Sequence, residues 1–273
     1  QKLLEQLSRP FTLQNEPVYV SASLGITLYP DDGQELSQLL RNADQAMYAA
    51  KAKGRNCYSF FTPSMQAELN ARAAMVNDLR GALARQEFAL VYQPIVELAT
   101  RRVYKAEALL RWRHPLRGLI SPADFVPLAE QTGLINEIGD WVFHVAVAQA
   151  NHWRQILHPD FQVGINKSPI QFLDLRHDPA DWIRYLQDHD ALGQSVVVEI
   201  TEGLLLEANN RTAEHLLVFR DAGIQVAIDD FGTGYSSLSY LKKFDIDYLK
   251  IDQSFVRNLS PESSDFVLCE AII

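Results

Sequence analysis

Cysteine is scarce in this 273-residue sequence, which has only Cys57 and Cys269. Two cysteines are too few for a disulfide framework, and they form no C-x-x-C pair, so we expect a reducing compartment. The sequence also lacks an apolar run long enough to span a membrane and lacks a signal-peptide pattern, although it opens inside an apparent helix. We therefore expect a cytoplasmic protein and leave open a membrane anchor upstream of the first residue.

Basic side chains are also fewer than acidic ones. The sequence has 25 lysines and arginines and 34 aspartates and glutamates, which gives a formal net charge of −9. A nucleic-acid polymer is bound by pairing many basic side chains with phosphates, so no such partner is expected. The sequence contains neither H-x-H nor H-E-x-x-H, which argues against a zinc hydrolase. The D-F-G at Asp230 follows no glycine-rich loop and no H-R-D segment, which argues against a protein kinase.

The sequence does contain enough apolar material for a sizeable core, since 47% of its residues are hydrophobic. Residues 1–62 indicate a short α/β piece, in which apolar residues at helical spacing predict a helix over 35–56. Residues 63–87 carry a single apolar stripe and predict a helix that connects two domains. The pattern fits packing against a neighbouring domain, and it also fits a signalling or dimerising helix.

Strand patterns dominate the chain from Phe88 onward. Apolar segments bounded by turn residues predict strands at 88–98, 103–112, 161–168, 195–202, 225–231 and 247–252. Helical patterns lie between most of them, which predicts a mainly parallel sheet covered by helices. A (β/α)8 barrel needs two more strands than these six. We therefore expect a barrel that is incomplete at its C-terminal end, with an open α/β sheet as the alternative.

Polar residues recur at or near the carboxyl ends of five of these strands. In a (β/α)8 barrel the active site lies at the carboxyl ends of the strands, which form the mouth of the barrel. The side chains of these five strands would therefore lie together at that mouth. The residues are Glu107, Asn166, Glu199, Asp229 with Asp230, and Lys250 with Asp252.

Several carboxylates and one amide oxygen form the hard, oxygen-rich ligand set that Mg²⁺ or Mn²⁺ prefers. Asp229 and Asp230 can both face the mouth only if the chain turns between them, and the glycines that follow favour such a turn. Lys250 could offer its charge to a phosphate oxygen or to an attacking water, and Arg111 suits a phosphate contact. The plainer alternative is a buried ion-pair network that caps the barrel.

Five motifs then resemble, in order and spacing, those of the EAL-domain phosphodiesterases of bacterial cyclic di-GMP signalling. They are AEALLRWRHP, GINKSPIQF, EITE, AIDDFGTGYSSLSYL and LKIDQSFV, and the likeness covers residues 88–273. The segments VSASLGITLYPDDG and LLRNADQAMYAAKAKGRN resemble the C-terminal part of a GGDEF, or diguanylate cyclase, domain, whose own active-site motif is absent. The resemblance implies a tandem GGDEF–EAL protein, with a partial α/β GGDEF fragment, a linker helix over 63–87 and a modified TIM-like barrel.

The resemblance also implies roles for individual residues. An EAL domain cleaves one phosphodiester bond of cyclic di-GMP to give linear pGpG with Mg²⁺ or Mn²⁺, and it commonly forms a homodimer under an upstream sensor domain. Carried over by motif, the metal ligands would be Glu107, Asn166, Glu199, Asp229 and Asp230. Lys250 would hold the attacking water, with Asp252 nearby, and Gln93 and Arg111 would contact the substrate. Glu202 would support the loop Phe231–Ser237, which would couple dimerisation to metal binding.

The sequence departs from the family pattern in two places. Lys167 stands where the family commonly has an apolar residue after the asparagine, and we expect its side chain to point away from the mouth. The family's E-G-V-E motif, with the general-base glutamate, and its Q-G-Y/F motif do not occur in this chain. We therefore expect the base to lie in a downstream part of a longer parent protein. A non-catalytic cyclic di-GMP receptor, signalling through the helix around Val76, is the main alternative function.

Overall fold

A computed structural model of the chain describes residues 2–175, 177–206, 210–232, 244–257, 259–260 and 262–272. The chain divides into two compact units, residues 1–78 and residues 79–273. Helix α3, Pro63–Ala82, runs through the boundary between them. Within the part of the chain that the structure describes, no helix is long and apolar enough to cross a membrane.

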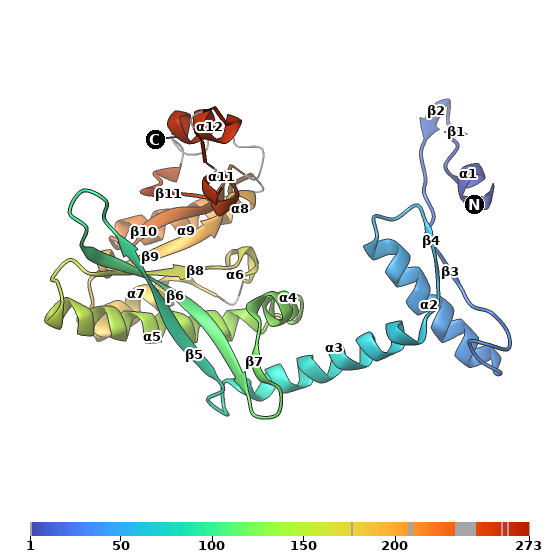
Figure 1. The fold of residues 1–273 in the computed structure, drawn as a ribbon, viewed down its shortest axis with the longest axis horizontal. Helices are drawn as coiled ribbons and strands as arrows, with labels where there is room; N and C mark the ends of the chain where they lie inside the picture. Colours follow the sequence, from blue (N-terminus) through green and yellow to red (C-terminus); the bar gives the residue numbers. More distant parts are fainter. Residues whose placement is uncertain are drawn as a thin grey trace. The chain divides into compact units, whose positions relative to one another are not determined.

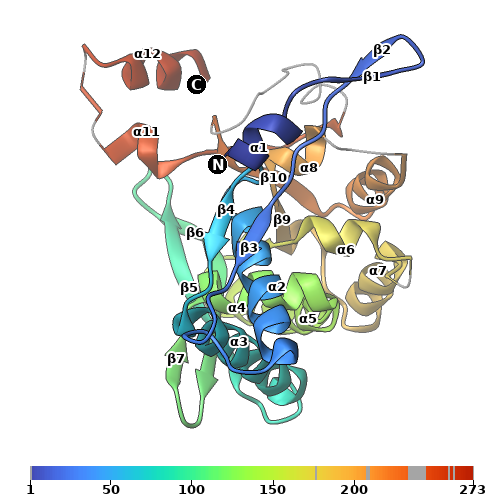
Figure 2. The same cartoon turned by 90° about the vertical axis from the view of Figure 1, so that its right-hand side faces the viewer.

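The first unit is built around helix α2, Leu36–Ala52, which packs against strands β3, Leu24–Ile26, and β4, Tyr58–Phe60 (Figure 2). The predicted helix over 35–56 is therefore confirmed, and Gly54 follows its end with a left-handed φ of 108°. The other elements of this unit are helix α1, Lys2–Leu7, and the antiparallel strands β1, Phe11–Leu13, and β2, Glu16–Val18.

The second unit contains one mixed sheet that includes all six predicted strands. The strand order is β11-β10-β9-β8-β6-β5, and the additional short strand β7 pairs with β6. The strands are β5 Phe88–Val96, β6 Val103–His114, β7 Gly118–Ile120, β8 Gln162–Asn166, β9 Val196–Thr201, β10 Gln225–Phe231 and β11 Tyr248–Ile251. Neighbouring strands are parallel from β6 through β11, whereas β5 and β7 run antiparallel to β6.

Helices connect the parallel strands, as the alternating pattern predicted, and several of them lie along one face of the sheet (Figure 1). Long helix α5 shows the reason in its sequence, because Ile138, Val142, Ala146 and Val147 recur at helical spacing and are buried. The helices are α4 Pro122–Thr132, α5 Ile135–Ile156, α6 Pro169–Leu173, α7 Pro179–Asp188, α8 Glu202–Leu206, α9 Asn210–Asp221, α11 Gln253–Arg257 and α12 Ser264–Ile272, with the 3-10 turn η1 Gly193–Ser195.

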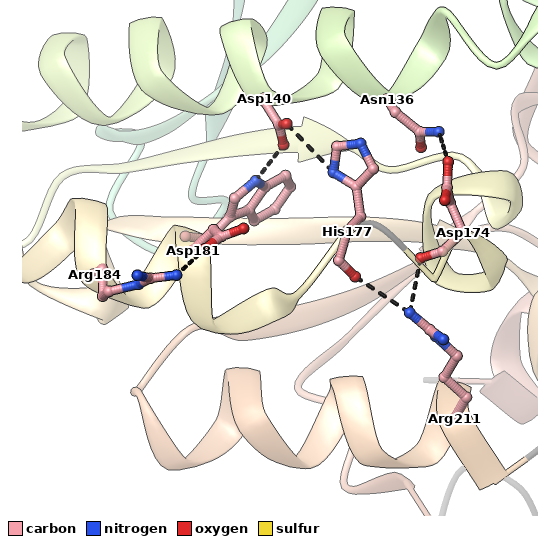
Figure 3. A network of polar contacts seen from close by, with 8 residues as sticks. Asn136, Asp140, Asp174, His177, Asp181, Arg184 and Arg211 are labelled. Atoms are coloured by element: carbon pink, nitrogen blue, oxygen red, sulfur yellow. Dashed lines mark hydrogen bonds and ion pairs between the residues drawn. The ribbon is translucent and has the colours of Figure 1, made fainter.

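The helical layer beside β8 has an aromatic core. The Trp182 ring of α7 stacks on Phe143 of α5 at 4.1 Å and lies 5.7 Å from Phe219 of α9. The Trp182 indole nitrogen donates to Asp140 Oδ1 at 2.8 Å, and Asp140 Oδ2 lies 3.3 Å from His177 Nδ1 (Figure 3). Polar and aromatic contacts together hold α5, α7 and α9 to one another.

Candidate metal centre

Strand register places the predicted ligands beside one another. Glu107 of β6 pairs with Gly164 of β8, and Asn166 at the end of β8 pairs with Glu199 of β9. On the next strand, Asp229 of β10 pairs with Thr201, two residues beyond Glu199. Since alternate residues of a strand share a face, these pairings send Glu107, Glu199 and Asp229 to the same side of the sheet.

Three carboxylates and one ammonium form the centre of this site. One oxygen atom from each of Glu107, Glu199 and Asp229 lies within 4.8 Å of the others. The Lys250 ammonium of β11 lies among them, with Nζ 3.0 Å from Glu107 Oε2 and 3.1 Å from Asp229 Oδ1. It also donates a short hydrogen bond to Glu199 Oε2.

The position of Glu107 differs from the expected one, because it lies in the middle of β6 rather than near the end of its strand. The strand continues to His114 because it pairs with β5 along its length and with β7 beyond Arg111. Its parallel pairing with β8, however, ends at Ala108. Glu107 therefore lies at the carboxyl end of the parallel segment of β6, level with the other ligands.

The chain does turn between the two aspartates, but the turn begins at an aspartate and not at a glycine. Asp230 has a left-handed φ of 53°, and the pairing of β10 with β11 shifts register between Ile228 and Phe231. The backbone nitrogen of Asp230 accordingly donates to Asp229 Oδ1 at 3.0 Å. Gly232 follows with a φ of 101°.

Buried Glu202 reaches this turn from the start of α8. The backbone nitrogen of Gly232 donates to Glu202 Oε2 at 3.2 Å, which holds the end of β10 against α8. The loop expected to couple dimerisation to metal binding begins at Phe231, and its residues 233–237 lie outside the described residues.

Charge and burial shift the pKa values of this cluster. Burial raises the pKa of the Glu199 carboxyl to about 7, and the neighbouring Lys250 opposes that rise. Burial would lower the pKa of the Lys250 ammonium, but Glu199 and Glu107 outweigh it and hold that pKa above its usual value. Burial, followed by the charges of Asp229 and Asp252, raises the pKa of Asp230. A nearby cation would therefore favour the charged forms of Glu199 and Asp230.

The remaining predicted residues line the edge of the cluster. Asn166 Nδ2 donates to Glu107 Oε1 at 2.8 Å, so the amide lies beside the carboxylates. Gln93 pairs directly with Glu107 across β5 and β6 and is exposed. Arg111 is half-buried, and its Nη1 donates to the backbone oxygen of Leu110 at 2.9 Å. Asp252 follows β11, and its Oδ1 accepts from the Ser254 backbone nitrogen at 2.8 Å.

A cavity of about 290 Å³ lies beside the carboxylates. It is bounded by strands β6, β8 and β9 and by helices α4, α5 and α6, and its polar lining includes Arg111, Asn166, Glu199 and Thr201. Glu199, Asn166 and the candidate substrate-contacting Arg111 therefore border one hollow, whose lining does not include Glu107 or Asp229.

Gly164 is a position beside the carboxylates that sequence reasoning missed. A Cβ atom at this residue would overlap the Glu199 carboxylate, so a glycine here makes room for a ligand. The sequence did contain a signal, because a lone glycine inside a strand pattern often marks a place where a neighbouring group approaches the backbone closely.

Lys167 points away from the ligands, as expected. Its Nζ lies 3.8 Å from the centre of the Trp182 ring and 5.3 Å from that of Phe172, in the helical layer. Burial lowers the pKa of this ammonium to about 7, and the charge of Asp140 opposes that change. The ammonium is held by aromatic rings through cation–π attraction.

The donor set fits a divalent metal ion. Carboxylate and amide oxygens are hard ligands, and Mg²⁺ and Mn²⁺ prefer them to the nitrogen and sulfur ligands typical of zinc. Glu107, Glu199 and Asp229 converge within the short span that a single ion requires, and Asn166 and Asp230 stand next to them.

Family models match both parts of the chain. The model of the EAL domain family matches residues 76–273, and that of the diguanylate cyclase, GGDEF domain matches residues 1–57. The chain is 41% identical over its whole length to the bifunctional diguanylate cyclase/cyclic di-GMP phosphodiesterase MucR of Pseudomonas aeruginosa, and 38% identical to the cyclic di-GMP phosphodiesterase PdeR of Escherichia coli. It spans 40% and 41% of the length of these two relatives.

Solved structures show the same fold. The chain is similar to the PaMucR phosphodiesterase in its c-di-GMP complex, with a TM-score of 0.67 and 39% identity over 73% of this chain and 80% of that chain. It is also similar to an EAL enzyme in a cAMP and cyclic-di-GMP bound form, with a TM-score of 0.70 and 29% identity over 89% of this chain and 64% of that chain. The mixed α/β sheet therefore has the TIM-like barrel fold of these proteins, and the chain belongs to the EAL domain family.

Proposed function

We propose that this protein is a metal-dependent phosphodiesterase that hydrolyses cyclic di-GMP to linear pGpG. The observation that carries the proposal is the convergence of Glu107, Glu199 and Asp229 from three neighbouring strands around one cation-binding position. Relatives named as cyclic di-GMP phosphodiesterases, and a similar structure solved with c-di-GMP, support this substrate.

The metal would be held by Glu107, Asn166, Glu199 and Asp229, and Asp230 would serve a second ion. The adjacent aspartates suit such a pair of sites, because the left-handed turn at Asp230 separates their side chains. When bound, Mg²⁺ or Mn²⁺ would lower the pKa of water and neutralise charge on the phosphate.

The protein's own residues would position the reactants. Lys250 would hold the attacking water and balance the charge that develops on the phosphate. The water oxygen would form a bond to one phosphorus while the bond from that phosphorus to a ribose oxygen breaks, which opens the ring of cyclic di-GMP. Asp252 lies two residues beyond Lys250 and would orient groups at the same edge.

Gln93 and Arg111 would contact the substrate. Gln93 stands opposite Glu107 on the neighbouring strand, and Arg111 lines the cavity beside the ligands. An arginine guanidinium suits a phosphate oxygen because it offers paired donors. Glu202 would fix the turn after Asp230 through the Gly232 backbone.

The wider organisation of the protein is part of the same proposal. We place the GGDEF-like part in residues 1–62, the connecting helix in 63–87 and the EAL domain in 88–273. The protein would act as a homodimer through its EAL domain and would take its signal from an upstream sensor domain. The resemblance of both parts to tandem signalling proteins supports this arrangement.

The direct test is cyclic di-GMP turnover to pGpG by the protein in its full natural length. We expect activity with Mg²⁺ or Mn²⁺, loss of activity with a chelator, and a loss of at least about 100-fold in Glu107→Gln. Glu137→Gln is the matched control, because Glu137 is an exposed acid on α5. An active Glu107→Gln enzyme would contradict the proposal, and tight binding without turnover would indicate the receptor alternative.

A further inference from the structure

Lys250 stands where a metal ion would be expected. Its Nζ contacts one oxygen each of Glu107, Glu199 and Asp229, which are the same three residues whose oxygens converge within 4.8 Å. A lysine ammonium has three N–H donors, and here two of them hydrogen-bond to Glu107 and Glu199, while Asp229 Oδ1 lies 3.1 Å from Nζ as a third anionic neighbour. The ammonium is therefore the central cation of the cluster and not a neighbour of it.

An ammonium and a divalent ion cannot share this position. Mg²⁺ holds carboxylate oxygens at about 2.1 Å, whereas an ammonium hydrogen-bonds to them at about 2.8 Å, so the two cations would overlap within one group of three ligands. They would also repel each other strongly, because like charges at such separations in a partly buried site are poorly screened. The Glu199 side chain is only 3% exposed and the Glu107 side chain 16% exposed, so little water enters between them.

The second observation is the reach of the lysine. Lys250 lies on β11, the strand that pairs with β10, and its side chain is 28% exposed. The contacts described for its Nζ all go to the three carboxylates, so breaking them leaves the long side chain free to swing toward solvent. The lysine is therefore only partly buried, and the contacts that hold its ammonium are those with the three carboxylates.

We propose that Lys250 is an internal counter-ion that competes with the divalent metal ion for Glu107, Glu199 and Asp229. Metal binding must expel the ammonium, and only the expelled lysine is free to meet the water or the substrate phosphate. Metal binding would thus free the Lys250 ammonium, which positions the water, in the same step that prepares the site for hydrolysis. This inference rests on the proposed metal-dependent function and adds an order of events to it.

The first test measures exposure of the Lys250 amine without any turnover. The full-length protein is labelled briefly with an amine-acetylating reagent, with Mn²⁺ or with a chelator, and labelling at each lysine is measured by mass spectrometry. We expect Lys250 to react at least about tenfold faster with Mn²⁺. Lys105 is the matched control, because its Nζ lies over the Tyr248 ring at 3.3 Å and not among the ligands, so its rate should stay constant.

The second test measures metal affinity from the electron paramagnetic resonance signal of free Mn²⁺. Lys250→Met keeps the length of the side chain and removes the competing charge, so we expect Mn²⁺ to bind at least about tenfold more tightly. Lys105→Met removes a charge from the same side of the sheet without opening the ligand group, and we expect a change of less than about threefold. If Lys250→Met does not fold, the labelling of the wild-type protein decides alone.

The outcomes separate this inference from the proposed function. An unchanged or slower Lys250 labelling rate while Mn²⁺ binds would overturn the inference, even if the enzyme hydrolyses cyclic di-GMP. Equal Mn²⁺ affinities of Lys250→Met and wild type would also overturn it. Faster labelling of Lys250 with Mn²⁺ in a protein that does not hydrolyse cyclic di-GMP would support the inference and reject the proposed function.

Discussion

Single residues decide whether the ligands can come together, and Gly164 is the clearest case. A Cβ atom at this position would overlap the Glu199 carboxylate, so Gly164→Ala should push that ligand out of the cluster. We expect Mn²⁺ affinity to fall at least about tenfold, comparable to the loss caused by disturbing groups that orient a ligand. The measurement is a Mn²⁺ titration, with circular dichroism as the check on folding.

Gly203→Ala is the control for that substitution, because a Cβ atom there would meet nothing within 4 Å. It should bind Mn²⁺ as the wild type does. If Gly164→Ala also bound Mn²⁺ normally, the close approach of Gly164 and Glu199 would have no functional meaning.

The buried His215 gives the protein an acid-sensitive residue away from the site. Burial, followed by the charge of Lys167, lowers the pKa of this imidazole to about 4, and among the described residues no hydrogen-bond partner reaches its Nδ1. The folded state then binds fewer protons than the unfolded state between pH 4 and 6.5, so stability should fall as the pH falls through that window. The full loss is about 3 kcal/mol.

Urea unfolding from pH 7.5 to pH 4.5 measures this loss. His215→Leu should flatten the dependence on pH, since leucine has no proton to gain. The exposed His152 provides the control, and His152→Leu should keep the wild-type slope. Equal slopes for all three proteins would show that another group causes the acid sensitivity.

Much of the residue-level site was predictable, and the reason is strand periodicity. Acids at corresponding places in successive strands indicated a cluster, and the structure brings Glu107, Glu199 and Asp229 together. The left-handed turn at Asp230 was assigned to the glycines instead, because glycine is the usual residue at positive φ. The importance of Gly164 depends on which side chain the neighbouring strand places over it, and one strand's sequence does not contain that information.

At the scale of elements, the helical layer depends on a small polar network (Figure 3). Asp140 of α5 accepts from the Trp182 indole and pairs with His177, so it ties α5 to α7. Asp140→Ala would leave the indole nitrogen of the buried Trp182 unpaired, and we expect the free energy of unfolding to fall by about 1–3 kcal/mol. Denaturant unfolding, followed by tryptophan fluorescence, measures the change.

Asp181 is the matched control in the same layer. It pairs with Arg184 on the exposed side of α7, where both side chains are more than half exposed. Asp181→Ala should therefore cost only about 0.5 kcal/mol, in line with exposed ion pairs. A cost for Asp181→Ala as large as that for Asp140→Ala would contradict the network as the source of stability.

Helices and strands with a long apolar pattern were predicted well. Strands whose length depends on pairing with neighbouring strands were predicted less well. The six predicted strands and helix α2 follow from the apolar periodicity of the sequence. Strand β7 was missed because its three residues are too few to show an alternation of apolar and polar residues. Glu107 was expected near the carboxyl end of its strand, but it lies in the middle of both the predicted strand 103–112 and the observed β6. It is level with the other carboxylates because the parallel pairing with β8 ends at Ala108, and the residues of β6 alone do not reveal that end.

At the scale of the whole molecule, the chain combines two compact units with different chemistry. The carboxylate cluster found among the described residues, Glu107, Glu199 and Asp229, lies within residues 79–273. Composition predicted a chain large enough for two domains, but the two family likenesses came from motifs. Physical patterns can indicate a metal site, whereas only the order of specific residues pointed to cyclic di-GMP.

Metal binding should therefore stabilise one unit and not the other. A ligand at 100 times its dissociation constant stabilises the state that binds it by about 2.7 kcal/mol. Amides of β9 and β10 that exchange only when the second unit unfolds should exchange up to about 100-fold more slowly with Mn²⁺ than with a chelator. Amides of α2 in the first unit should be unaffected, and in Glu107→Gln the slowing should disappear from β9 and β10. Hydrogen exchange followed by mass spectrometry resolves these segments, and equal slowing in α2 would show that Mn²⁺ acts on the whole chain and not through the carboxylate cluster.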